Sequence, residues 1–507
     1  MEEISEEISD DTQGSPSKTR LLIISNRLPL VLNKEKDGRW SQVPGSGGLV
    51  TALAPVLRNR GGLWIGWPGT SEASGKELEK VLAGATQHSG FTLKPVSLTS
   101  EEIEKYYLGF ANKSIWPLFH DLLSQCKFDP SYWFTYQKVN HKFAQVITEH
   151  LTGEDYIWVH DYHLMNVARE LRGLDVKENI GFFLHIPFPP LDIFLKLPWR
   201  FQILRSLLKY DLIGFQTLRD RRNFMQCART LIKDLSVQGK GQVITLRFGN
   251  RYVRVGAFPI SIDFKEFARL ASTKEVADGA WYIHEQLPNV QIILGVDRLD
   301  YTKGILERLE AFRNVLLRHP ELEENVVFVQ VVVPSRRKIA EYLELQIEIE
   351  RLVSEINGQF TRTGWVPIHY IFRTMDRSDL LAYYRTAEIA IVTPLKDGMN
   401  LIAKEYCASS LEENCVLILS EFAGAAAQLQ KGALLVNPHD KEGVADAIYK
   451  AVNMSRDERR QRMKKLRASV KRHDIYWWVN SFLHAAIAKR LNNFPVMEEY
   501  VPQMETE

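Results

Sequence analysis

Short apolar runs recur along the chain, and each is followed by a polar turn and then by a stretch with helical periodicity. The runs are rich in β-branched residues, as expected of buried strands. A first set lies at 21–25, 63–67, 156–160, 180–186, 211–216 and 252–258. The pattern restarts after residue 260, with runs at 291–296, 325–333, 368–372, 389–392, 416–420 and 433–436. Strands that alternate with helices favour parallel sheets, so the sequence predicts two α/β domains.

Helices are predicted between these strands and after the last of them. Shorter ones are expected at 49–57, 101–125, 304–318 and 442–453. Ser335 is a candidate N-cap for a long helix that extends to Ile356, where Asn357 and Gly358 are expected to stop it. The basic run at 459–472 fits one solvated face of a helix over 456–472 rather than a nucleic-acid-binding arm. A last amphipathic helix begins at Tyr476 and extends to about residue 491.

The composition is that of a soluble globular protein. The chain has 507 residues, of which 45% are hydrophobic and 25% are charged, and this length predicts more than one core. The net charge of +2 gives no electrostatic reason to expect binding to nucleic acid or to a membrane surface. The four cysteines show no metal-ligand spacing, which fits reduced thiols in the cytoplasm. No apolar run approaches the length of a membrane span.

Both ends of the chain are expected to lie outside the folded domains. Residues 1–19 are acidic and then rich in Ser, Gly and Pro, and they contain no apolar stripe. They therefore predict a disordered tail and no secretory signal. Residues 495–507 are expected to form a loose tail.

The stretch from Asp397 to Glu405 is the strongest local candidate for a binding site. It joins the run at 389–392 to a segment that favours a helix from about Asn400. In such a strand–turn–helix unit, backbone N–H groups and the positive helix end can hold a phosphate or a sugar. Asp397 stands at the strand exit, and Glu405 could accept hydrogen bonds from ligand hydroxyls. The same residues would also suit a turn and the helix dipole, so this stretch alone leaves both interpretations open.

Charged residues follow several other predicted strands. Open parallel sheets bind ligands at the carboxyl edge of their strands. Residues at or near such ends include Arg27, Asp161, His185, Arg298, Arg336 and Asp397. Arg298 and Lys303 bracket one of these turns, as a diphosphate would require. Taken alone, the two cations fit solvated surface charges better. The Gly-rich segment 44–48 precedes a predicted helix and would let backbone approach a phosphate closely.

The remaining motifs were searched for a metal site and for the signatures of other enzyme classes. His160 and His163 invite a metal interpretation, but no third ligand cluster accompanies them, so no metal site is predicted. His185 could equally be a core histidine whose hydrogen bonds are satisfied. The sequence contains no P-loop, no G-x-S-x-G and no H-E-x-x-H. The pattern alone therefore predicts a cleft between two Rossmann-like domains that binds phosphorylated and polyhydroxyl ligands.

Six motifs, taken together and in this order, resemble those of trehalose-6-phosphate synthases. They are Ser25-Asn-Arg27, Gly45-Ser-Gly-Gly48, His160-Asp-Tyr-His163, Phe183-Leu-His-Ile-Pro-Phe-Pro189, Val296-Asp-Arg-Leu-Asp-Tyr-Thr-Lys-Gly304 and Asp397-Gly-Met-Asn-Leu-Ile-Ala-Lys-Glu405. The resemblance covers about residues 20–490. It implies a glycosyltransferase of the GT-B fold, with Rossmann-like domains at 20–260 and 261–475. It also implies that a C-terminal helix, 476–494, crosses back onto the first domain.

The reaction implied by the resemblance is transfer of glucose from UDP-glucose to glucose 6-phosphate. The anomeric configuration is retained, the products are α,α-trehalose 6-phosphate and UDP, and no metal or other cofactor takes part. The implied catalytic residues are Asp161, His185, Arg298, Lys303 and Asp397. The implied donor-binding residues are Gly48, His185, Arg298, Lys303, Asp397, Gly398, Met399, Asn400, Leu401 and Glu405. The implied acceptor-binding residues are Arg27, Tyr107, Trp116, Asp161 and Arg336.

Several features stay open. Pro334 stands before Ser335 and Arg336 where some members carry Thr, and Met375 stands where members can carry an aromatic residue near the uracil. The base of the donor, UDP or GDP or ADP, is therefore not fixed. One alternative is a synthase that uses another phosphorylated acceptor, such as a glucosylglycerol-phosphate synthase, and another is a non-catalytic homologue that senses sugar phosphates. The resemblance further implies a cytoplasmic dimer or tetramer and a separate trehalose-6-phosphate phosphatase.

Overall fold

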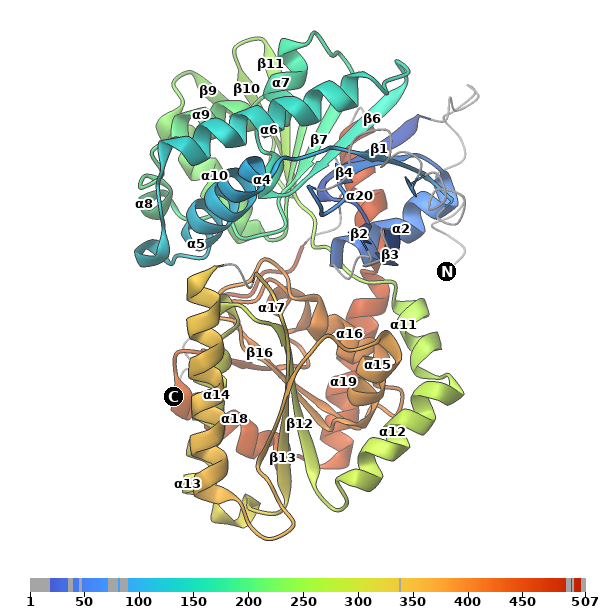
Figure 1. Ribbon diagram of the computed structural model, residues 1–507, viewed down its shortest axis with the longest axis vertical. Coiled ribbons are helices and arrows are strands. Elements are labelled where there is room, and N and C mark those ends of the chain that lie inside the picture. Colours follow the sequence, from blue (N-terminus) through green and yellow to red (C-terminus); the bar gives the residue numbers. More distant parts are fainter. Residues whose placement is uncertain are drawn as a thin grey trace.

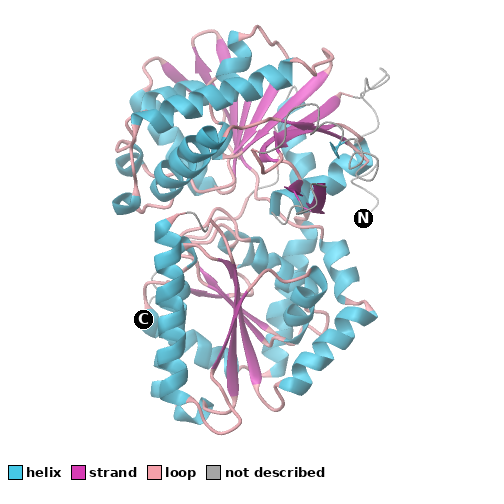
Figure 2. Cartoon of the chain, viewed as in Figure 1, coloured by secondary structure: helices cyan, strands magenta, loops and turns pink. Residues whose placement is uncertain are grey.

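The computed structural model describes residues 19–34, 40–44, 48–71, 81–82, 90–336, 339–488, 494 and 497–502. These residues form two lobes that follow one another along the long axis of the molecule (Figure 1). In each lobe helices cover a central sheet (Figure 2). The two α/β domains that the apolar pattern predicts are therefore present as two separate sheets.

The first lobe contains a nine-stranded sheet in the order β5-β4-β1-β6-β7-β8-β11-β10-β9. Its strands are β1 (Arg20–Arg27), β4 (Leu63–Trp67), β5 (Thr92–Pro95), β6 (Asp155–His160), β7 (Asn179–Phe183), β8 (Leu212–Phe215), β9 (Leu235–Gln238), β10 (Val243–Phe248) and β11 (Arg251–Ala257). Neighbours from β5 to β11 are parallel, whereas β10 is antiparallel to β11 and to β9. The apolar pattern does not predict this antiparallel edge, because β9 is largely exposed and lacks the run of a buried strand.

The second lobe contains a six-stranded sheet in the order β14-β13-β12-β15-β16-β17, and all of its pairs are parallel. Its strands are β12 (Gln291–Arg298), β13 (Val326–Val333), β14 (Ile368–Phe372), β15 (Ile389–Val392), β16 (Val416–Ser420) and β17 (Leu434–Val436). Each corresponds to a predicted apolar run. A separate antiparallel hairpin, β2 (Leu30–Lys34) and β3 (Trp40–Pro44), follows β1 and was not predicted.

Helices connect the strands and cover both sheets. Those of the first lobe are α2 (Gly48–Arg60), α4 (Ser100–Glu102), η1 (Ile103–Ile115), α5 (Trp116–Phe119), η2 (Leu123–Gln125), α6 (Pro130–Thr148), η3 (Tyr162–Leu164), α7 (Val167–Gly173), α8 (Leu191–Phe194), α9 (Arg200–Leu207) and α10 (Leu218–Leu231). Those that follow are α11 (Phe264–Ala271), α12 (Lys274–Gln286), η4 (Tyr301–Lys303), α13 (Ile305–Arg318), η5 (Pro320–Leu322), α14 (Ala340–Phe360), α15 (Arg377–Thr386), α16 (Leu401–Ser409), α17 (Ala426–Leu429), α18 (Lys441–Val452), α19 (Arg456–Arg472) and α20 (Ile475–Ile487).

The helix predicted over 101–125 has a different form. A capping box begins it, in which the Thr99 side chain accepts from the N–H of Glu102 and Glu102 accepts from the N–H of Thr99. It continues as the π-helix η1 and then α5, and it ends at Phe119. Sequence periodicity does not reveal a π-helix, because the extra residue in each turn is stabilised by packing. The predicted helical stretch is therefore confirmed to Phe119, although most of it is a π-helix, and only the short η2 follows.

The long helix α14 begins and ends later than predicted. Its N-cap position is Ile339, which makes no side-chain capping bond, so the assignment of Ser335 as the cap is wrong. Asn357 and Gly358 lie inside the helix rather than ending it. The amide of Asn357 both donates to and accepts from the backbone of Ile368 in β14, at 3.0 Å in each case. This tertiary contact outweighs the tendency of Asn and Gly to stop a helix.

The last helix, α20, crosses back to the first lobe, where it packs against α2, β8 and β11 (Figure 1). Trp478 lies 5.0 Å from both Trp158 and Phe183, measured between ring centres. Arg254 donates to the carbonyls of Ala485 and Ala488, which stabilises the negative end of the helix. The predicted return of the C-terminal helix is therefore confirmed. The helix ends at Ile487, and residues 489–493 of the predicted range lie outside the described residues.

Part of the predicted C-terminal tail is described in the structure, whereas the predicted N-terminal tail is not. Residues 1–18, where a disordered tail is predicted, lie outside the described residues. Within the predicted C-terminal tail, Glu498 pairs with Lys431 of the second lobe and Glu499 with Arg222 of the first. These residues form no helix or strand, but their carboxylates meet cations on both lobes. No helix in the described part of the chain is long and apolar enough to span a membrane.

Candidate active site

The carboxyl ends of the two parallel sheets meet where the lobes face each other. Gly398 follows β15, and a Cβ atom added to it would lie 2.1 Å from the carbonyl oxygen of His185, which follows β7. Arg336 follows β13 and donates at 3.5 Å to the hydroxyl of Tyr162, which follows β6. Residues from four strand ends are thus brought to one junction, as parallel sheets with facing carboxyl edges require.

Two arginines from different lobes lie over aromatic rings at this junction. The guanidinium carbon of Arg27 is 4.0 Å from the ring centre of Trp67 and 5.5 Å from that of Tyr107. The guanidinium carbon of Arg336 is 4.1 Å from the ring centre of Trp116. Cation–π contacts of this kind orient a guanidinium, whose N–H edge can then meet an anion.

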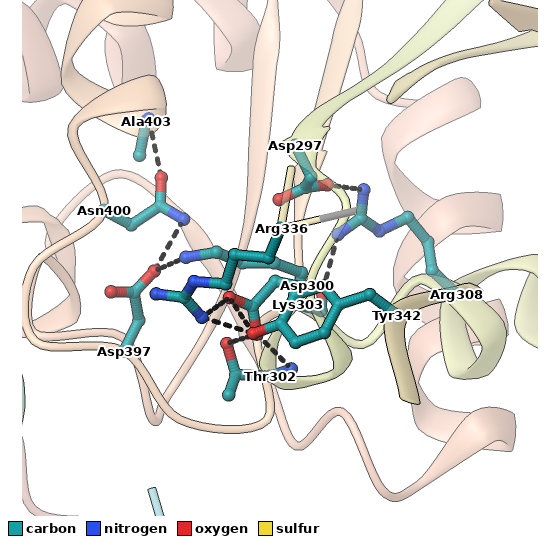
Figure 3. A network of polar contacts seen from close by, with 10 residues as sticks. All are labelled: Asp297, Asp300, Thr302, Lys303, Arg308, Arg336, Tyr342, Asp397, Asn400 and Ala403. Atoms are coloured by element: carbon teal, nitrogen blue, oxygen red, sulfur yellow. Dashed lines mark hydrogen bonds and ion pairs between the residues drawn. The ribbon is translucent and has the colours of Figure 1, made fainter. Parts of the chain in front are cut away.

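Arg336 is held by a second set of contacts within its own lobe. Its guanidinium donates to Asp300 at 3.2 Å and also to the hydroxyl of Tyr342 (Figure 3). Burial would raise the pKa of Asp300, but Arg336 and Lys303 hold it below its usual value. The backbone of Arg336 has φ +46°, a left-handed conformation that few residues other than glycine adopt. The side chain is therefore fixed in place by ion pairing, ring stacking and an unusual backbone.

The positive charges of Arg27, Arg298 and Arg336 all influence the hydroxyl of Tyr107. Burial would raise the pKa of Tyr107, but Arg336, Arg27 and Arg298 together lower it below its ordinary value. His163 stacks on Tyr107 with ring centres 5.9 Å apart, and its pKa is well below its usual value because it is buried and faces the arginines. A neutral His163 adds no further charge. The region around Tyr107 therefore carries a positive potential suited to a phosphate.

Asp161 and His185 lie side by side beneath this region. The Asp161 carboxylate accepts from the backbone N–H of His185 at 3.2 Å, and its own backbone has φ +76°. Burial raises the pKa of Asp161 to about 7 and lowers the pKa of His185 to about 3. His185 is therefore a neutral ring near pH 7. Its Nε2 lies 3.1 Å from Nδ1 of His160, so one of these nitrogens donates to the other.

The turn at 397–401 is fixed by polar contacts with η4. Asp397 accepts from the ammonium of Lys303 at 2.5 Å and from the side-chain amide of Asn400 at 3.2 Å (Figure 3). Burial would raise the pKa of Asp397, but Lys303 holds it below its usual value. Asn400 has φ +73°, and its side chain accepts from the N–H of Ala403 as the N-cap of α16. The start of α16 therefore points at this turn, as predicted.

Buried charges also support η4 from behind. Arg308 donates to Asp297 at 2.7 Å, to Thr393 at 2.9 Å and to the carbonyl of Lys303 at 3.1 Å. Gly304, which links η4 to α13, has φ +62°, and a Cβ there would lie 2.2 Å from the carbonyl of Thr393. Lys303 is thus held on a segment that cannot shift without breaking several hydrogen bonds.

The other predicted donor residues lie around the same turn. Glu405, in α16, accepts from the hydroxyl of Tyr384 at 3.1 Å, and burial raises its pKa to about 7. Arg298, at the end of β12, is exposed. Met399 is buried, and Leu401 is the first residue of α16. Gly48 is the first residue of α2, and residues 45–47 of its motif lie outside the described residues.

A cavity of about 450 Å³ opens beside Asp397, within the range of about 300–1,000 Å³ that is common for small-molecule sites. It lies between the lobes, and its lining includes His120, Pro187, Arg219, Lys396, Asp397 and Phe422. Lys396 of the second lobe pairs with Asp121 of the first at 2.5 Å. In the described part of the chain no group of three His, Cys, Asp or Glu residues is arranged to hold a metal ion.

Sequence reasoning did not identify four of the residues that hold the arginines. They are Trp67, Tyr162, Asp300 and Tyr342. Tyr162 and Asp300 lie inside quoted motifs, so their position was available as a signal. Trp67 ends a predicted strand, and Tyr342 lies in a long helix, where an aromatic residue is more often a core residue than a site residue.

Comparison with known proteins decides the family. The model of glycosyltransferase family 20 matches residues 19–488. The chain belongs to this family. A trehalose-6-phosphate synthase of Mycolicibacterium gilvum is 42% identical over 496 residues, which cover 96% of this chain and 97% of the relative.

Solved structures of family 20 support the same assignment. One is an α,α-trehalose-phosphate synthase (UDP-forming) from Burkholderia xenovorans in complex with glucose 6-phosphate. Its TM-score is 0.83 at 34% identity, and the match covers 92% of this chain and 99% of that one. Another is an E. coli structure bound with UDP-2-fluoro glucose, with a TM-score of 0.81, 34% identity and the same two coverages. The GT-B fold expected from the six motifs is thereby confirmed.

Proposed function

We propose that this family 20 chain transfers glucose from UDP-glucose to glucose 6-phosphate, with retention, and releases α,α-trehalose 6-phosphate and UDP. The observation that carries the proposal is that Arg27 of the first lobe lies over Tyr107 and Arg336 of the second lies over Trp116, while Lys303 pairs with Asp397 in the turn at 397–401. Two phosphorylated ligands, one on each lobe, would account for cations that come from both sheets.

The second lobe would bind the donor. Arg298 and Lys303 would hold the diphosphate, whose negative charge grows as the bond to glucose breaks. The backbone N–H groups of 398–401 and the start of α16 would bind the glucose and its phosphate. Glu405 would accept hydrogen bonds from the ribose hydroxyls, a role that suits a carboxyl fixed by Tyr384.

The acceptor would lie against the first lobe. Arg27 and Arg336 would bind its phosphate in the two-pronged manner that a guanidinium allows, while Trp116 and Tyr107 would keep their places as stacking surfaces. Asp161, with its pKa raised to about 7 by burial, would bind an acceptor hydroxyl close to the reacting carbon.

A panel of acceptors tests the proposal. Purified protein is incubated with UDP-glucose and, in turn, glucose 6-phosphate, glycerol 3-phosphate, free glucose or no acceptor, and UDP release and product mass are measured. We expect release with glucose 6-phosphate and a product of the mass of a disaccharide phosphate. Faster turnover with glycerol 3-phosphate would favour a glucosylglycerol-phosphate synthase, and no turnover with sugar-phosphate binding would favour a sensing homologue.

The proposal extends to the setting of the reaction. It places the enzyme in the cytoplasm as a dimer or tetramer, with a separate phosphatase that acts on its product. Light scattering of the purified protein tests the oligomeric state, and a monomer would contradict this part of the proposal.

A further inference from the structure

Lys404 is a buried lysine that the proposed donor and acceptor contacts do not use. It lies near the start of α16, one residue before Glu405, and it is 1% exposed. Its ammonium donates to the backbone carbonyl of Ile260 and to Oε1 of Gln428, at 2.7 Å in both cases. Both acceptors are neutral, and burial lowers the pKa of Lys404 to about 7. A methionine would fill much the same volume without the cost of burying an ammonium.

The carbonyl that Lys404 contacts belongs to the segment that connects the lobes. The N–H of the same residue, Ile260, donates to Oε1 of Gln216 at 2.9 Å. Gln216 follows β8 in the first lobe, whereas Lys404 belongs to the second. The backbone of Ile260 is thus bonded to Gln216 of the first lobe and to Lys404 of the second. Helix α20 makes two more hydrogen bonds to the connecting segment. The indole N–H of Trp478 donates to the carbonyl of Phe258, and the backbone N–H of Ile475 donates to the carbonyl of Ile262.

The same contacts lead back to the candidate active site. Nε2 of Gln216 lies 3.5 Å from Nδ1 of His185. The carbonyl of His185 touches Gly398, in the turn that begins the helix of Lys404. His185, Gln216, Ile260, Lys404 and the 397–401 turn therefore form a closed circuit of contacts across the two lobes.

We propose that Lys404 is a positioning residue that, together with Gln216, clamps Ile260 and thereby sets the donor turn against His185. The inference rests on the proposed function, because its kinetic readout is glucosyl transfer. The clamp fixes the position of the donor turn, in the second lobe, relative to His185 in the first. Its loss therefore lowers turnover. It leaves the affinity for UDP unchanged, because the proposed nucleotide contacts lie within the second lobe.

The test compares Lys404→Met, Gln216→Leu and the double variant with Tyr406→Phe. The last removes a buried hydrogen bond of the same helix, to the carbonyl of Ala387, that lies outside the circuit. We expect each single clamp variant to lower kcat by about tenfold or more, since small misplacements of reacting groups are costly. The double variant should lose no more than the worse single variant, because both act on one peptide. Tyr406→Phe should stay within about twofold in kcat, as expected of a bond outside the circuit.

Two further readouts separate a clamp from a structural role. The Kd for UDP, measured by calorimetry, should stay within about threefold in all variants. Amide hydrogen exchange of the peptide that contains Ile260 should be faster in both single variants and unchanged in Tyr406→Phe. If Lys404→Met does not fold, Gln216→Leu breaks the same clamp from the other lobe.

Several results would overturn the clamp. They are multiplied losses in the double variant, unchanged kcat, a loss of UDP affinity in step with kcat, or unchanged exchange at Ile260. A wild type that transfers no glucose would instead defeat the proposed function, and the exchange measurement would still decide the clamp.

Discussion

At the scale of single residues, Arg298 and Lys303 carry the same predicted role in different surroundings. Arg298 is exposed at the end of β12, whereas Lys303 is only 12% exposed and pairs with Asp397. Removing either cation removes charge from the proposed diphosphate site, but only the loss of Lys303 leaves a carboxylate without its partner. The two substitutions should therefore agree in turnover and differ in stability.

We predict that Arg298→Ala and Lys303→Ala each lower kcat by about 10²–10³, the usual cost of one preorganised contact to developing charge. Lys303→Ala should also lower the free energy of unfolding by about 1–3 kcal/mol, because the buried Asp397 carboxylate loses its cation and keeps only the amide of Asn400. UDP release at saturating UDP-glucose and urea unfolding provide the measurements. Arg313→Ala, in α13, is the control and should change neither. Turnover within about threefold of wild type would contradict the donor assignment.

Glu405 predicts a pH dependence of stability. Burial raises its pKa in the folded chain to about 7, above the value of an unfolded glutamate, so the folded state keeps a proton that the unfolded state loses. The contribution of the protonated carboxyl to the free energy of unfolding is fully present below the pKa of an unfolded glutamate, and it is lost as pH rises towards 7. Glu405→Gln should therefore gain stability relative to wild type between pH 5 and pH 8, on the order of 2 kcal/mol. Urea unfolding at both pH values measures the difference, and an equal difference at the two would contradict the raised pKa.

At the scale of elements, the turn before α16 depends on close backbone contact. A Cβ at Gly398 would lie 2.1 Å from the carbonyl of His185, and a Cβ at Gly424 would lie 1.9 Å from the carbonyl of Gly398. Neither contact can be relieved by a side-chain rotation, because both partners are backbone. The donor turn is therefore packed between the first lobe on one side and the segment after β16 on the other.

We predict that Gly398→Ala lowers kcat by about tenfold or more, because the turn and His185 must move apart. Gly358→Ala is the matched control, since it lies in α14 with open space around the added methyl group. It should keep full turnover and raise the free energy of unfolding by up to about 1 kcal/mol, the difference between Gly and Ala in a helix. Equal turnover in the two variants would show that the close contact is not required.

Helices and strands were predictable from the sequence where the apolar pattern alone determines their position. All six strands of the second sheet follow from it, because they are apolar runs, and β12, β13, β15 and β16 are almost entirely buried. The π-helix η1 and the late end of α14 were not predictable, since packing and the contacts of Asn357 decide them. The candidate site shows the same division. Arg27, Arg298 and Asp397 follow from their place at strand ends, whereas Trp67 and Tyr342 become site residues only through contacts distant in sequence.

At the scale of the whole molecule, residues near the C-terminus connect the lobes a second time. Glu499 pairs with Arg222 of α10, and Glu498 pairs with Lys431 beyond α17. We predict that deleting residues 497–507 lowers Tm by about 1–3 °C at low salt, and by less at high salt, because exposed ion pairs are weak and screened. Deleting residues 1–18 should leave Tm and turnover unchanged. Calorimetry measures the Tm of both truncated chains. An equal change of Tm in the two would contradict the bridging role of Glu498 and Glu499.

The proposed acceptor site combines Arg27 of the first lobe with Arg336 of the second, which lies over Trp116 of the first. If they bind the acceptor phosphate, each should contribute about 1.5–3 kcal/mol to its recognition, which is roughly 10–200-fold in affinity. A lysine at position 336 would lose the two-pronged geometry and the ring stacking. The preference for glucose 6-phosphate over free glucose should therefore fall in both Arg27→Ala and Arg336→Lys, while the Kd for UDP stays the same.

The most direct test of the account is the ratio of kcat/KM for glucose 6-phosphate to kcat/KM for glucose, measured by UDP release in wild type, Arg27→Ala and Arg336→Lys. The account predicts a large ratio in the wild type that falls by about tenfold or more in each variant. An unchanged ratio would mean that these arginines do not bind the acceptor phosphate, and it would contradict the acceptor site described for this chain.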